Sequence, residues 1–229
     1  MSTAPQAFAG PLQESIEAGN VESVISEIAR GADVNEADMM LGLPLMIAAQ
    51  KNHVAIAKLL VASGADVNGS DMTGTALHAA ARVGHTEMVV FLIGAGADLD
   101  AMPDSRTTPL HQAAQNGQTE TIKLLIQNGA SVDIDAESKS ALWWAANAGH
   151  VDAVKILLAN GADIQDQFYH HNTPLHSSVI GGHIAVVELL LDEGADINEI
   201  DREQFTPLKL AQILKRSDII ELLIQRGAQ

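Results

Sequence analysis

Apolar and polar positions follow a helical period in short segments of this chain, and the segments come in pairs. In the pair at 109–115 and 119–127, the first segment carries the small residues Ala113 and Ala114. The second carries a wider apolar stripe of Ile122, Leu124, Leu125 and Ile126. Apolar residues spaced three and four apart indicate a helix with one buried face. The pattern therefore predicts two short antiparallel helices. The small side chains on the inner face of the first helix let it approach its neighbours closely.

The pair recurs along the whole sequence. A run of the type L-L-x-x-G-A ends each unit, at steps of 32 or 33 residues, with its glycine at Gly31, Gly64, Gly96, Gly129, Gly161, Gly194 and Gly227. A period of this size indicates stacked supersecondary units that share one elongated core. The sequence predicts an all-α repeat solenoid, with a single repeat domain over 1–229 divided at 8–35, 36–68, 69–100, 101–133, 134–165, 166–198 and 199–229.

Local signals mark where the helices begin and end. Threonine precedes proline at Thr108-Pro109, and the same dipeptide recurs at 173–174 and 206–207. A threonine N-cap followed by proline at the first helical position is a common helix start. The repeated glycine is suited to the left-handed residue that ends a helix.

These residues carry a resemblance to the ankyrin repeat family. The units are similar to the family pattern T-P-L-H-x-A-A-x-x-G-H followed by L-L-x-x-G-A-D-V-N, with close matches at 173–176, 182–183 and 64–68. The resemblance implies helix pairs joined by β-hairpin-like loops, and a concave face of hairpin tips and inner helices that binds proteins. The first unit, with Pro11-Leu12-Gln13 where the T-P-L-H stretch is expected, and the last, with Lys209 and Lys215 at family positions, depart from the pattern as capping repeats do.

Composition narrows the choice of partner and compartment. The chain has 13 basic and 29 acidic residues, a net charge of −16 and no cysteine. This charge disfavours nucleic acid and anionic membrane surfaces and favours a partner with a basic surface. The absence of cysteine excludes disulfides and thiol ligands. Because neither a signal peptide nor a membrane span is recognisable, we expect a cytoplasmic protein, with secretion by a leaderless route left open, and a monomer because both terminal repeats are polar.

Catalytic and metal sites find little support in the sequence. No nucleophile, metal or phosphate-binding spacing stands outside the repeats, so no enzymatic activity and no cofactor are predicted. Seven of the nine histidines occupy two recurring family positions, where the resemblance implies structural hydrogen bonds. Only His170 and His171 lie outside them, in a predicted hairpin tip, and adjacent residues of a strand point apart. No metal site is therefore predicted.

Aromatic residues give the strongest indication of a binding surface. Five of seven lie between 143 and 205, at Trp143, Trp144, Phe168, Tyr169 and Phe205. Their register predicts hairpin or inner-helix positions, to which Ile180 adds an apolar side chain. Tryptophan and tyrosine dominate interface hot spots. The alternative is that Trp143 and Trp144 pack against each other and against neighbouring loops.

A second candidate surface lies at earlier hairpin tips, where Met39, Met40, Met72 and Met102 recur. Methionine suits adaptable binding surfaces, and it also fills gaps between loops. Arg82 and Arg106 are basic points nearby that could hold a partner's carboxylates. Their alternative is ordinary solvation with local pairs.

The leading hypothesis is a non-enzymatic protein–protein interaction module or adaptor. A second hypothesis is a carrier of a small ligand or metallocofactor, held by His170, His171, Tyr169 and Trp143. A third is an assembly chaperone or inhibitor, because the layout of seven units is similar to the ankyrin-repeat chaperone of the proteasome regulatory particle.

Overall fold

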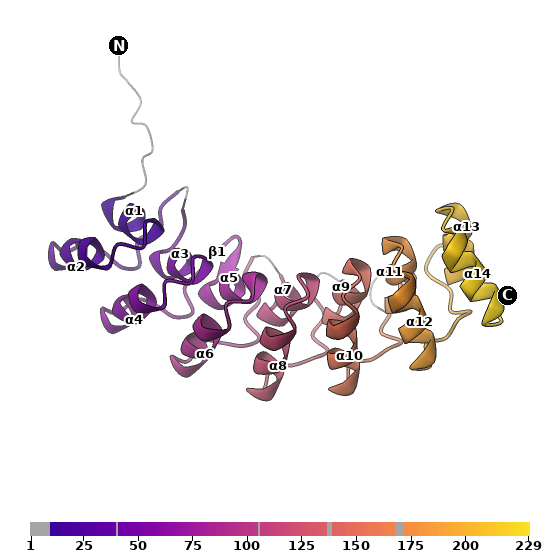
Figure 1. Cartoon of the computed structure of the whole chain (residues 1–229). Coiled ribbons are helices and arrows are strands. Elements are labelled where there is room, and N and C mark those ends of the chain that lie inside the picture. The colour runs from indigo at the N-terminus through magenta and orange to yellow at the C-terminus, as the bar shows by residue number, and fades with distance from the viewer. Residues whose placement is uncertain (1–9, 40, 105, 137–138, 168–171) are drawn as a thin grey trace, which may run out of the picture. The chain divides into compact units, whose positions relative to one another are not determined.

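The computed structural model describes residues 10–39, 41–104, 106–136, 139–167 and 172–229. The described residues form fourteen helices and one two-stranded hairpin (Figure 1). The chain divides into two compact units, unit 1 at Met1–Ser105 and unit 2 at Arg106–Gln229. Each predicted repeat range holds one pair of helices.

Unit 1 consists of three helix pairs. They are α1 (Pro11–Glu17) with α2 (Val21–Ala29), α3 (Pro44–Gln50) with α4 (Val54–Ala62), and α5 (Ala76–Val83) with α6 (Thr86–Gly94). First helices pack on first helices, α1 on α3 and α3 on α5, and second helices do the same. Strands β1 (Ser70–Asp71) and β2 (Gly74–Thr75) form an antiparallel hairpin before α5.

Unit 2 consists of four helix pairs. They are α7 (Pro109–Gln115) with α8 (Thr119–Gln127), α9 (Ala141–Ala148) with α10 (Val151–Ala159), α11 (Pro174–Gly181) with α12 (Ile184–Asp192), and α13 (Pro207–Ile213) with α14 (Ser217–Gln225). Helix α9 lies between α7 and α11 and packs on both. A single antiparallel bridge joins Ala136 and Lys139 in the loop before α9.

The core repeats with the period of the sequence. One leucine from each second helix after α2 is fully buried, namely Leu60, Leu92, Leu125, Leu157, Leu190 and Leu223. The first helices bury small residues, including Ala48, Ala80, Ala113, Ala145 and Ala211. Large side chains on one helix and small ones on its partner let closely spaced helices pack at the density typical of protein interiors. This alternation is what the apolar pattern predicts.

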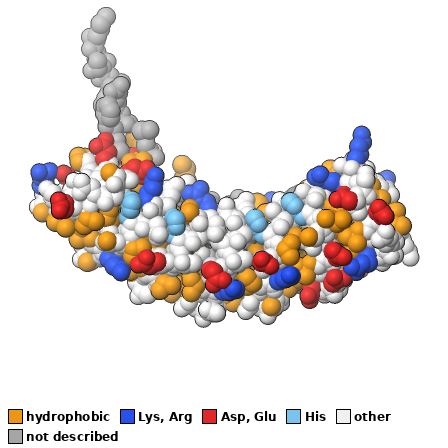
Figure 2. Space-filling model, viewed as in Figure 1, with side chains coloured by type: hydrophobic (Ala, Val, Ile, Leu, Met, Phe, Trp, Pro, Cys, Tyr) orange, Lys and Arg blue, Asp and Glu red, His pale blue; other side chains and the backbone are white. Residues whose placement is uncertain are grey.

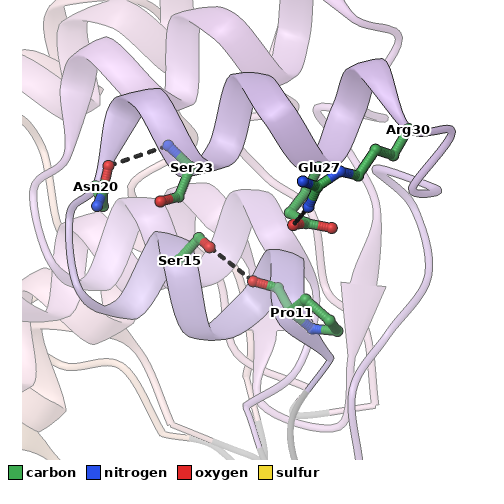
Figure 3. A network of polar contacts seen from close by, with 6 residues as sticks. All are labelled: Pro11, Ser15, Asn20, Ser23, Glu27 and Arg30. Atoms are coloured by element: carbon green, nitrogen blue, oxygen red, sulfur yellow. Dashed lines mark hydrogen bonds and ion pairs between the residues drawn. The ribbon is translucent and has the colours of Figure 1, made fainter.

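The helix starts and ends also follow from local sequence. Thr108 and Thr173 cap α7 and α11 by accepting a hydrogen bond from the backbone N–H three residues later, at 3.4 Å in each helix. Gly64 and Gly161 end α4 and α10 with φ of 94° and 90°, where an L side chain is strained. In the first repeat, Asn20 caps α2 by accepting from Ser23 N–H at 3.0 Å (Figure 3).

The last repeat replaces the usual glycine and histidine between its helices by lysine and arginine. Lys215 adopts the left-handed conformation with φ of 57°. Arg216 donates from Nη2 to the carbonyl oxygen of Ile180 at 3.1 Å. The equivalent His183 lies 3.0 Å from the carbonyl oxygen of Asn147, also in the preceding repeat. The arginine therefore makes the same link between repeats as the histidine.

Candidate functional site

Two helices of unit 2 begin with a threonine and a histidine that lock neighbouring repeats together. His111 Nδ1 accepts from Thr108 N–H at 3.3 Å, while Nε2 donates to the carbonyl oxygen of Ile134 at 3.1 Å. In the same way, His176 Nδ1 accepts from Thr173 N–H and Nε2 donates to the carbonyl oxygen of Phe205. Burial lowers the pKa of His176, so the neutral ring with these two bonds is favoured. Each ring ties the start of a helix to the loop of the next repeat.

Helix α9 departs from this arrangement because Trp143 stands at the histidine position. Ser140 caps the helix, and its Oγ accepts from Trp143 N–H at 3.2 Å. The rings of Trp143 and Trp144 meet edge to face, with centroids 5.2 Å apart and planes at 84°. Both side chains are half-buried, whereas His111 and His176 are buried. In α9, a pair of partly exposed rings therefore takes the place of a buried histidine that bonds to the next repeat.

A lysine from the preceding loop covers this pair. Lys139 Nζ lies 4.7 Å from the centroid of each tryptophan ring. A cation within about 6 Å of a ring centroid is attracted by the negative face of the ring. The bridge between Lys139 and Ala136 fixes the backbone of the lysine one residue before the helix cap. Trp143, Trp144 and Lys139 together are called the tryptophan site below.

The loop that follows α10 contains shielded polar atoms without partners. Gln165 Oε1, Asp166 Oδ2, Asn172 Oδ1 and Trp144 Nε1 are buried with no hydrogen-bond partner among the residues that the structure describes. A tryptophan ring has one N–H donor and no acceptor nitrogen, so it cannot bond a cap N–H and a loop carbonyl at once as the histidines do. A shielded polar atom left unpaired costs about 1–3 kcal/mol. The loop between α10 and α11, together with Trp144, is therefore incompletely satisfied in its polar contacts.

Asp166 carries a perturbed carboxyl group in the same loop. Burial, together with the nearby charges of Asp163, Asp133 and Asp135, raises the pKa of Asp166 to about 6. A hydrogen bond from Ser140, the cap of α9, opposes this rise. Asp166 thus bonds the loop to the start of α9. The electrostatic potential around it is negative because the neighbouring charges are carboxylates.

The structure places the other predicted residues of unit 2 as follows. Ile180 is half-buried on α11, and Phe205 is half-buried with its backbone carbonyl bonded to His176. Trp143 contacts α11 through its carbonyl oxygen, which accepts from Ser177 Oγ at 3.2 Å. The remaining residues predicted for this patch, Phe168, Tyr169, His170 and His171, lie outside the described residues.

The methionine series lies in unit 1. Met39, Met72 and Met102 are 94%, 80% and 49% exposed, while Met40 lies outside the described residues. Arg82 is exposed on α5 of the same unit. Arg106 is exposed at the start of unit 2, with φ of 50°. Figure 2 shows that hydrophobic side chains in both units are interspersed with acidic and basic ones on the visible face.

Neither a metal centre nor a membrane span is found in the part of the chain that the structure describes. Within it, no three His, Cys, Asp or Glu side chains are grouped so that they could hold a metal ion. None of its helices has the length and apolar character needed to cross a membrane. Because His170 and His171 are not described, the carrier hypothesis stays untested.

Comparison with known sequences establishes the family. The sequence model described as ankyrin repeats in three copies matches residues 12–103, 77–168 and 164–229. The chain belongs to the ankyrin repeat family. Ankyrin repeats are protein–protein interaction modules, and the fold is generally non-enzymatic. The resemblance to the family and the all-α architecture of repeated helix pairs are confirmed.

Relatives and solved structures agree with this assignment. The ankyrin repeat chain is 36% identical over 94 residues to the mouse ankyrin repeat and SOCS box protein 5, an alignment that covers 41% of this chain and 29% of that protein. It is 32% identical over 92 residues to the human ankyrin repeat and SOCS box protein 11, covering 40% and 28%. The matched segment thus spans less than a third of each relative. The crystal structure of the human ASB11 ankyrin repeat domain superposes with a TM-score of 0.85 at 28% identity, covering 96% of this chain and 99% of that chain.

Sequence analysis of the ankyrin repeat chain missed two residues of the site, Lys139 and Asp166. Lys139 stands next to the cap residue Ser140, so its closeness to the tryptophans along the chain was available as a signal. Asp166 precedes the aromatic segment by two positions, but nothing in the sequence marks it as buried. Its side-chain hydrogen bond comes from Ser140, a residue of the preceding repeat.

Proposed function

We propose that this ankyrin repeat chain is an adaptor-like module that binds a partner protein through the tryptophan site of unit 2. One observation carries the proposal: α9 places two half-exposed tryptophans at a helix start where α7 and α11 bury a histidine. Replacing a buried, hydrogen-bonded histidine by partly exposed aromatic rings loses the hydrogen bonds that the histidine makes in the other repeats. A binding role accounts for that loss, because tryptophans are enriched at interface hot spots.

The rigidity of the site supports the same role. Trp143 and Trp144 are held by the helix cap, by packing of α9 on α7 and α11, and by their edge-to-face contact. Side chains that are already ordered lose little entropy when a partner binds. Ile180 and Phe205 on the following repeats extend the proposed surface, and we keep Phe168, Tyr169, His170 and His171 as predicted members of it.

The charge of the chain favours a basic partner. A net charge of −16 accelerates encounter with a positively charged surface and disfavours acidic ones. Two matched relatives are named for a SOCS box beside their ankyrin repeats, which is in keeping with an adaptor role. The methionines of unit 1 are the second candidate surface, because Met39 and Met72 are the more exposed side chains.

The test is capture of a partner from a lysate of the source cells, followed by binding measurements with the purified partner. The informative variant is Trp143→His with Trp144→Ala, because histidine is the residue that α7 and α11 carry at this position and supports their helix starts. The matched control is Ile224→Ala, an exposed apolar residue of α14 in the same unit. We expect binding to be lost only in the tryptophan variant. Unchanged binding by a folded tryptophan variant would reject the site and leave the methionine surface of unit 1 to be tested next.

A further inference from the structure

We propose that the tryptophan pair is a receptor for a lysine side chain of a basic partner segment, and that Lys139 occupies this receptor in the free protein. The inference rests on the proposed function and specifies the chemistry of the partner. It follows from the contact of one ammonium group with two ring faces at the same distance of 4.7 Å.

The geometry is that of a cation site rather than of an apolar pocket. Two rings at 84° to each other form the walls of a corner, and the ammonium of Lys139 lies near both of them. Tryptophan is the side chain whose ring face attracts cations most strongly. A corner that accommodates the ammonium of Lys139 is also suited in size and charge to the ammonium of another lysine.

The contacts of Lys139 allow its ammonium group to move away from the ring faces. Within the described residues its ammonium forms neither an ion pair nor a hydrogen bond, so the ring faces are its only specific partners there. Its backbone stays fixed by the bridge to Ala136 while the side chain turns toward water. An exposed lysine ammonium is well hydrated, so its release carries little penalty.

The surroundings select for a cation and against an anion. Asp133, Asp135, Asp163 and Asp166 lie in the loops before α9 and α11 and act on one another electrostatically. Their field attracts a positively charged segment and repels an acidic one.

The chain offers a specific readout, because it contains only two tryptophans and both are in the site. The probe is a five-residue peptide, acetylated and amidated, with one central lysine between glycines and serines. Its titration into protein labelled with nitrogen-15 is followed by the two indole N–H signals. We expect saturable shifts of both indole signals with the lysine peptide and weaker binding of the arginine peptide. A norleucine peptide of the same length should neither shift the signals nor bind.

Lys139→Ala gives the decisive comparison. If Lys139 competes for the corner, its removal strengthens binding of the lysine peptide about three- to sixfold. Lys155→Ala is the matched control, because Lys155 is exposed on α10 of the same unit and its removal changes the net charge equally. Circular dichroism checks that each variant is folded.

Equal affinity of the Lys139→Ala and Lys155→Ala variants would overturn the proposal, as would equal binding of the norleucine peptide or tighter binding of the arginine peptide. Failure of the proposed function has a different signature. If the captured partner still binds the tryptophan variant while the lysine peptide does not, the site binds lysine but the partner uses another surface. If the partner needs the tryptophans and the lysine peptide never binds, the interface stands and only its lysine specificity is wrong.

Discussion

The two units differ in how they present their apolar side chains to water. In unit 1, Met39 and Met72 are almost fully exposed at separate loop tips. In unit 2, Trp143 and Trp144 are half-buried, in contact with each other and covered by Lys139. An exposed methionine loses rotamer freedom when it binds, whereas a packed pair of rings has already lost it. This difference favours the more ordered side chains, rather than the more exposed ones, as candidates for strong binding.

The glycine after the first helix of a repeat and the glycine after the second differ in the space around them, and one example comes from each unit. A Cβ added to Gly149 of unit 2 would lie 2.5 Å from His183 Nδ1, whereas a Cβ added to Gly64 of unit 1 would meet nothing within 4 Å. Both residues have left-handed backbones, with φ of 81° and 94°. We expect Gly64→Val to lose about 1–2 kcal/mol through backbone strain alone, and Gly149→Val about 2–4 kcal/mol because overpacking is added. Urea denaturation measures both, and equal losses would show that the turn of unit 2 is not enclosed as described.

Partner affinity is the direct test of the difference between the surfaces. Trp143→Ala with Trp144→Ala is expected to weaken binding of the captured partner by about 2 kcal/mol or more, as hot-spot residues do. Met39→Ala with Met72→Ala in unit 1 is expected to change it by less than about 0.5 kcal/mol. Isothermal titration calorimetry with the purified partner measures both. The reverse order of effects would assign the binding surface to unit 1.

A carboxylate in each unit allows a comparison by pH. Asp166 has a folded-state pKa of about 6 against an ordinary value of 3.8, chiefly because of burial. The folded state therefore holds the proton more tightly, and stability falls as pH rises from about 4 to about 6. Asp166→Asn removes this loss, and its amide oxygen can still accept from Ser140. The variant should gain stability over the wild type between pH 4 and pH 7, by about 1 kcal/mol or less because solvent screens the half-exposed group.

The control for this measurement is Asp104→Asn in unit 1, where the carboxylate is exposed. Thermal melting at a series of pH values follows all three proteins. A constant difference between wild type and Asp166→Asn across the range would contradict the burial of this carboxyl group.

The smallest expected effect concerns the loops before the first helices. Unit 1 has glycine at the left-handed position of the loop before α3, at Gly42, whereas unit 2 has Arg106 with φ of 50° before α7. Arg106→Gly is expected to stabilise the chain by about 0.5 kcal/mol, because release of strain exceeds the entropy that glycine adds to the unfolded state. Gly42→Ala is the opposite change and should destabilise it. A lower melting temperature for Arg106→Gly would show that the arginine makes a compensating contact.

Much of the fold could be predicted because its causes are local. Thr108 caps a helix as its sequence context predicts, and Gly64 ends one in the left-handed conformation. The presence of tryptophan at a histidine position could likewise be read from the repeat pattern at Trp143. The role of Arg216 could not, because its guanidinium reaches the carbonyl oxygen of Ile180, 36 residues earlier. The pattern only showed that a histidine was missing there.

Local signals along the chain are enough to specify ankyrin repeats of paired helices, because periodic burial, helix caps and left-handed glycines act within one repeat. What the tryptophans of α9 contact depends instead on how the repeats pack. Lys139 lies over both rings and Asp166 is buried beside Ser140 only because successive repeats stack with a fixed offset. Contacts of this kind join side chains from different loops and helices, and their distances depend on packing that no single repeat specifies.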